Sequence, residues 1–124
     1  RKGQRSTYPN FLSAQPLTGG SRAMPRAVVV HKEGPYQDLK IEDVPALEPG
    51  KGNVVVRVLS CGLAFPDVLM VLGKHIMRKP VPFVPGSEIC GEITALGEGV
   101  QGLSVGDRVF GTAVRGGLSD EAEM

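Results

Sequence analysis

The sequence has no tryptophan, few aromatic residues and only two cysteines. Aromatic residues make up 5% of the 124 residues, and Cys61 and Cys90 are too far apart to form a C-x-x-C pair. This excludes a four-thiolate zinc site and gives no sign of a disulfide framework. We predict two buried free thiols, because free cysteine is among the most buried residue types, and a reducing compartment.

Long apolar runs are also missing. No stretch reaches the roughly 18 residues that a membrane-spanning helix needs, so we predict no membrane span. The chain does contain 17 glycines and 10 prolines, with 41% hydrophobic and 22% charged residues. This composition favours a soluble domain of short strands joined by tight turns over a helix bundle. The length allows one domain with one modest core.

Acidic residues are absent from residues 1–32, which hold six basic ones, whereas the remainder holds eight basic and 13 acidic residues. Within this basic region, residues 1–23 are predicted to form an extended arm, because Pro9, Pro16 and Gly19-Gly20 interrupt any helix. A composition rich in Arg and Ser without acids is typical of organelle transit peptides, although the prolines prevent their amphipathic helix.

From this arm we expect the mature end of a processed protein on the matrix side of mitochondria. The alternatives are a cytoplasmic protein, a cloning remnant, or a true start at Met24. We expect the arm to bind other protein subunits of a complex, through Arg5, Tyr8, Phe11, Leu12 and Leu17. Its basic residues would also permit RNA contact, but a charge run is usually only solvated, so this alternative has no further support.

From residue 24 onward the sequence predicts strands. The β-branched or alternating runs lie at residues 27–31, 39–44, 53–60, 89–96 and 105–112. The alternation at 39–44 predicts a half-buried strand. Gly91, inside one of these strands, predicts a bulge or a close approach of two backbones.

Residues 65–72 predict the only helix. Pro66 suits its first turn, Asp67 complements the positive end of the helix dipole, and Gly73 ends it. Residues 78–86 contain three prolines and are predicted to be a rigid extended loop. Residues 24–124 are therefore expected to form one mainly β domain, a partly open barrel with one short helix.

Three motifs suggest chemistry only weakly. Residues 97–102 spell G-x-G-x-x-G after a strand, but another strand follows where a dinucleotide site needs a helix, so we interpret these residues as turn glycines. The two histidines, His31 and His75, could join Cys61 and Cys90 around a metal only by coincidence. No G-x-S-x-G elbow supports Ser-His-Asp catalysis.

The spaced motifs resemble one family segment. They are the run at 60–70, Gly73-Lys74, the run at 80–88, Gly91, Gly97 to Val100, and Gly106 to Val109. Over about residues 24–119 the chain is similar to the N-terminal GroES-like domain of medium-chain dehydrogenases/reductases, in particular to zinc-independent NADPH:quinone oxidoreductases. The resemblance implies a GroES-like partly open β-barrel.

The resemblance also implies that pocket chemistry has been lost. Zinc-dependent relatives have Cys at the Ala64 position and His at the Ser87 position, so no metal site is expected. Zinc-independent quinone reductases usually have Asn at the Ala64 position, and often Gln at that of Leu72 and Tyr at that of His75. Together with the corner residues Phe65 and Asp67, these are the expected vestigial substrate-pocket positions, and no catalytic residue is expected.

In the family, NADPH binds to a Rossmann domain that follows this segment. The present sequence ends at Met124, so we expect no cofactor, and NADPH only if the intact protein has a Rossmann domain. The favoured hypothesis is a non-catalytic structural or accessory subunit of a larger, mitochondrial assembly. The alternative is an N-terminal fragment of an active NADPH-dependent quinone or enone reductase. A co-chaperonin-like ring is disfavoured, because the proline-stiffened loop 78–86 is a poor mobile loop.

Overall fold

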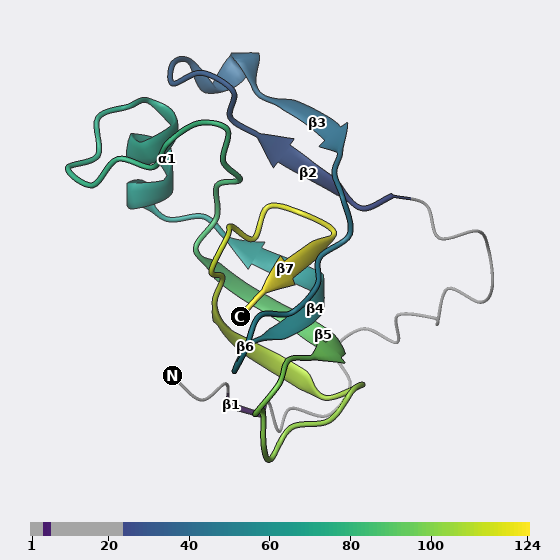
Figure 1. Cartoon of the computed structure of the whole chain (residues 1–124). Coiled ribbons are helices and arrows are strands. Elements are labelled where there is room, and N and C mark those ends of the chain that lie inside the picture. Colours follow the sequence, from purple (N-terminus) through teal and green to yellow (C-terminus); the bar gives the residue numbers. More distant parts are fainter. Residues whose placement is uncertain (1–3, 6–23) are drawn as a thin grey trace.

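The computed structural model describes residues 4–5 and 24–124, and its strands form two sheets (Figure 1). The larger sheet has the strand order β1-β6-β5-β4-β7, and the smaller one pairs β2 with β3. All strand pairs are antiparallel. The elements are β1 (Gln4–Arg5), β2 (Arg26–Val29), a 3-10 turn (Tyr36–Asp38), β3 (Lys40–Asp43), β4 (Val54–Gly62), α1 (Phe65–Val71), β5 (Glu88–Leu96), β6 (Arg108–Thr112) and β7 (Glu121–Glu123).

The larger sheet carries the main core, because its central strands are rich in β-branched residues that alternate between its two faces. The buried side chains of this cluster are Val54, Val56, Ile89, Ile93, Val109, Ala113 and Ala122. The predicted close approach at Gly91 is confirmed: a Cβ there would lie 2.6 Å from the carbonyl oxygen of Arg57. The register of β4 against β5 also shifts between Val58 and Ser60, which is the irregularity that the glycine predicts.

The smaller sheet is attached to the rest by two backbone bridges. Val30 and Phe83 exchange hydrogen bonds of 2.8 and 3.2 Å, and Ala27 forms a bridge with Ser119. Val30 and Phe83 pack with Val71 of α1 in a second core cluster. The predicted half-buried strand at 39–44 is wrong in its burial, since Ile41 of β3 is 69% exposed. The alternation in β3 therefore does not mark a buried face.

The predicted short helix is confirmed as α1. Its first residues follow Ala64, and Gly73, with a φ of 67°, ends it in the left-handed conformation that favours glycine. No helix in the described part of the chain is long and apolar enough to cross a membrane.

The mainly β, partly open fold is also confirmed, because the two sheets do not close into a barrel. The loop at 78–86 has no helix, and Gly99 and Gly102 lie in turns with positive φ, as predicted. The prediction of two buried thiols is wrong: Cys61 and Cys90 are free but only half-buried. Of the arm, only the backbone of β1 is described, where Arg5 pairs with Val109. Tyr8, Phe11, Leu12 and Leu17 lie outside the described residues.

Candidate functional site

A corner of the fold brings three of the predicted pocket positions together around one buried carboxylate. Asp67, in the first turn of α1, is only 3% exposed. Its Oδ2 accepts the backbone N–H of Ala64 at 2.9 Å, and its Oδ1 accepts the hydroxyl of Ser87 at 2.7 Å. Asp67 therefore fixes the start of the helix to the residue just before β5.

The structure keeps Asp67 in the first turn of α1, where it was predicted to complement the helix dipole. It also buries the carboxylate as the acceptor of two specific hydrogen bonds, which the sequence analysis did not predict. The spacing of Ala64 and Asp67 is that of a capping box, which is a signal for the first bond. The bond to Ser87 joins residues 20 positions apart and has no such local signal.

The remaining predicted pocket positions do not converge on this corner. Phe65 points largely into solvent, with 72% of its surface exposed. Leu72 and His75 lie past the other end of α1, roughly 10 Å away by the rise of a helix of this length. The Nδ1 of His75 accepts the N–H of Met77 at 3.1 Å. Their assignment to a former substrate pocket stays a prediction.

The chemistry available at the corner is limited. Ala64 has a methyl side chain, and the hydroxyl of Ser87 is donated to Asp67. The pKa of the Cys61 thiol, at the end of β4, is raised, first because burial disfavours the thiolate and second because the charge of Asp67 repels it. A thiol with a raised pKa is a poor nucleophile, since the thiolate is the reactive form.

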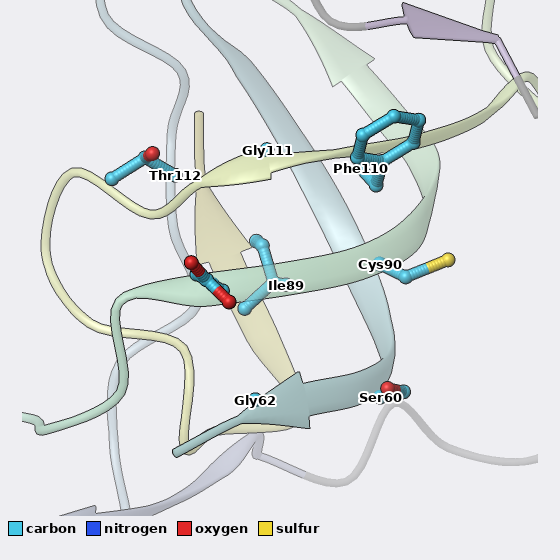
Figure 2. Close-up of a pocket in the computed structure, with 8 residues that line it drawn as sticks. Ser60, Gly62, Ile89, Cys90, Phe110, Gly111 and Thr112 are labelled. Atoms are coloured by element: carbon cyan, nitrogen blue, oxygen red, sulfur yellow. The ribbon is translucent and has the colours of Figure 1, made fainter. Parts of the chain in front are cut away.

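A shallow depression of about 490 Å³ adjoins the corner on the outer face of β4, β5 and β6 (Figure 2). Ser60, Cys90 and Phe110 are neighbours across these strands, and Gly62, Glu88 and Thr112 form the next row. Positions two apart in a strand face the same side, which explains why these six residues share the depression. The sequence prediction missed this surface, although alternation in the predicted strands was a usable signal.

The residues present do not fit a zinc ion. Zinc needs Cys, His or carboxylate ligands, and Ala64 and Ser87 supply neither a thiolate nor an imidazole. In the part of the chain that the structure describes, no three His, Cys, Asp or Glu side chains are grouped to hold a metal.

The residues do not fit a dinucleotide either. A pyrophosphate is bound by free N–H groups where a helix begins after a glycine-rich turn. The glycines at 97–102 lead to β6 rather than to a helix, and at α1 the carboxylate of Asp67 already occupies the first turn. We therefore derive no hydride-transfer step from these residues.

Comparison with known proteins identifies the fold. Residues 50–122 match the model of the alcohol dehydrogenase GroES-like domain, which is more than half of the chain. The chain belongs to this family. A quinone oxidoreductase-like protein 2 homolog from Nematostella vectensis is 43% identical over 93 residues, which are 74% of this chain and 25% of the relative. A synaptic vesicle membrane protein VAT-1 homolog from Rattus norvegicus is 39% identical over 68% of this chain and 22% of its own length.

Solved structures agree with this assignment. The human VAT-1 homolog-like protein superposes with a TM-score of 0.77 at 32% identity, over 82% of this chain and 33% of that one. A mycobacterial quinone oxidoreductase superposes with a TM-score of 0.73 at 32% identity. The superposition covers 80% of this chain and 31% of the mycobacterial one. The predicted resemblance to quinone oxidoreductase-like medium-chain dehydrogenases/reductases is confirmed. The chain spans about a quarter of the length of the curated relatives that it matches.

Proposed function

We propose that this GroES-like domain is non-catalytic and serves as a structural or accessory part of a quinone oxidoreductase-like protein or complex. The observation that carries the proposal is the corner around Asp67. The side chains at Ala64 and Ser87, where catalytic relatives are expected to place ligands or an amide, offer a methyl group and a hydroxyl already bound to Asp67. Neither of these two side chains therefore has a free N–H or O–H to donate to a substrate.

The test is a turnover measurement on the full chain. NADPH oxidation is followed by absorbance with a benzoquinone as acceptor, and we expect no rate above that of buffer. The variant Ala64→Asn restores an amide at the corner and is the matched comparison. Turnover by the unaltered chain, abolished by unfolding, would contradict the proposal.

A second candidate is favoured by the comparisons. The chain would be the N-terminal domain of an active NADPH-dependent quinone or enone reductase, with the nicotinamide held by a different domain. The support is that the matched segment is a quarter of a quinone oxidoreductase-like relative, and that a similar mycobacterial protein, 31% identical with a TM-score of 0.74, was solved with NADPH. The native mass separates the two: 13.1 kDa supports the accessory role, and about three times that mass supports the reductase.

The cellular setting rests on composition alone. We propose a mitochondrial matrix location and binding of partner subunits through residues 1–23, because this region is basic, acid-free and carries a few large apolar side chains. Cell fractionation of the tagged full chain tests the location. Co-purification with and without residues 1–23 tests the role of the arm, and an unchanged set of partners would contradict it.

A further inference from the structure

A second depression, of about 520 Å³, lies beyond the C-terminal end of α1, away from the corner around Asp67. Residues 31–33 line one side of it and residues 78–81 the other. At one end the two segments are joined by the backbone bridge between Val30 and Phe83. At the other end the guanidinium of Arg78 contacts the carboxylate of Glu33 at 2.8 Å. The depression is therefore bounded at both ends by specific contacts.

The segments that line it are held in place. The N–H of Gly34 donates to the carbonyl oxygen of Val71 at 2.9 Å, which fixes residues 31–33 between two anchored points. Pro80 and Pro82 restrict the opposite segment, because each proline ring fixes its φ angle. The backbone of these segments would therefore lose little conformational entropy when a ligand binds.

The charges in the depression do not cancel. Arg78 is neutralised by Glu33, and the Nε2 of His31 lies 2.6 Å from a carboxylate oxygen of Glu42. Lys32 and Lys79 also line the depression, and neither has an ion-pair partner among the residues that the structure describes. Two lysines without an ion-pair partner among the described residues therefore line the same depression.

We propose that this depression binds the phosphate group of a small phosphorylated organic molecule. A phosphomonoester carries a charge between about −1.5 and −2 near neutral pH, which matches two free lysines better than a single carboxylate does. Pro80 and Val81, the latter 44% exposed, provide an adjoining apolar wall for the organic part. The contacts at its two ends leave a short site, which suits a single terminal group better than an acidic polypeptide that would have to run along it.

The test is an NMR titration of the full chain, following backbone amide shifts. The probes are inorganic phosphate, AMP, adenosine and an acidic peptide without phosphate. We expect saturating shifts at residues 31–33 and 78–81 with phosphate and with AMP. AMP should bind more tightly than phosphate, with a dissociation constant on the order of 1 mM. Adenosine should cause no saturating shift. Raising the salt concentration should weaken binding, because exposed charges are screened.

Matched variants identify the residues responsible. Lys79→Ala and Lys32→Ala should each weaken AMP binding about fivefold, the effect of removing one charge at contact distance in water. Lys79→Glu should weaken it more than tenfold. Lys51→Ala is the control, because Lys51 is an exposed lysine that pairs with Glu98 elsewhere on the surface. The affinity of the Lys51→Ala variant for AMP should change less than twofold.

Three results would overturn the proposal: no saturating shift with phosphate or AMP, saturation with the acidic peptide alone, or an equal loss in Lys51→Ala. An equal loss in Lys51→Ala would show only that AMP is attracted to any positive charge on the surface. The titration does not depend on the proposed non-catalytic role, since its readout is local to residues 31–33 and 78–81. The outcome of the benzoquinone turnover measurement would not change the interpretation of the titration.

Discussion

Two buried carboxylates, Asp67 and Glu123, each link separate segments of this domain, and their surroundings differ. Glu123, at the end of β7, is 2% exposed and binds three different groups. Its Oε1 accepts the N–H of Gly50 at 2.8 Å and the amide of Asn53 at 3.0 Å, and its Oε2 contacts the guanidinium of Arg115 at 2.9 Å. The donors that Asp67 has among the described residues are both neutral, the N–H of Ala64 and the hydroxyl of Ser87.

The difference lies in how each negative charge is compensated. At Glu123 a cation and two donors share the charge, so the carboxylate serves as a clasp between the turn at residues 50–53, β7 and the segment that holds Arg115. No cation among the described residues pairs with Asp67, and its charge is the second cause, after burial, of the raised pKa of the Cys61 thiol. We therefore expect Glu123 to matter most for stability, and Asp67 to matter both for stability and for the electrostatics of the corner.

The largest expected effect is that of Glu123→Ala. The change leaves the N–H of Gly50 and the amide of Asn53 without their acceptor and opens a small cavity, so we expect a loss of about 3 kcal/mol in the free energy of unfolding. Urea denaturation followed by circular dichroism measures it. The matched control is Glu98→Ala, whose exposed pair with Lys51 should be worth less than about 0.5 kcal/mol. Equal losses in the free energy of unfolding in the two variants would refute the proposed role of Glu123 in linking these segments.

Asp67→Ala should have a smaller effect, about 2 kcal/mol, because it removes two hydrogen bonds to neutral donors. Ser87→Ala removes only one of them and should cost about 1 kcal/mol. Both are measured by urea denaturation. If Asp67→Ala proved as stable as the unaltered chain, the carboxylate would not be what connects α1 to β5.

Much of this fold could be predicted from local sequence. The valine-rich run at 53–60 gives β4 because its residues suit a pleated, buried strand, and Pro66 with Gly73 gives α1 its bounds. The exposure of Ile41 could not be predicted in this way. Alternation indicates which side chains share a face, but only the tertiary arrangement decides whether anything covers that face.

The candidate site was predictable only in part. The motifs drew attention to Ala64, Asp67 and Ser87 separately, whereas the bond between Asp67 and Ser87 depends on how α1 is placed against β5. The clasp at Glu123 escaped the sequence analysis for the same reason, since its partners Gly50 and Asn53 are about 70 residues away.

A pH titration of stability should separate the charged role of Glu123 from its packing. Hydrogen bonds from Asn53 and Gly50, together with Arg115, hold the pKa of Glu123 below its usual value of 4.5. The stabilisation from this depressed pKa is complete above pH 4.5 and is lost as the pH falls through the folded-state pKa. The native chain should therefore lose its advantage over Glu123→Gln in acid, as measured by urea denaturation across pH. A constant difference would show that the charge does not contribute.

The smallest expected effect concerns the electrostatics of the corner. Asp67→Asn removes the negative charge that disfavours the Cys61 thiolate, so the pKa of Cys61 should fall and its alkylation by iodoacetamide should become about twofold faster at mildly alkaline pH. The rate at each cysteine is followed by peptide mass spectrometry, with Cys90 as the internal reference. Glu123→Gln is the matched control, because Glu123 pairs with Arg115 and is not among the causes of the raised pKa of Cys61. A pH profile distinguishes a changed pKa from greater access, since only the first moves the midpoint. If the midpoint of the pH profile did not move in Asp67→Asn, burial alone would set the pKa of the Cys61 thiol. The two carboxylates would then differ in their hydrogen-bond and ion-pair partners, but neither would influence this thiol electrostatically.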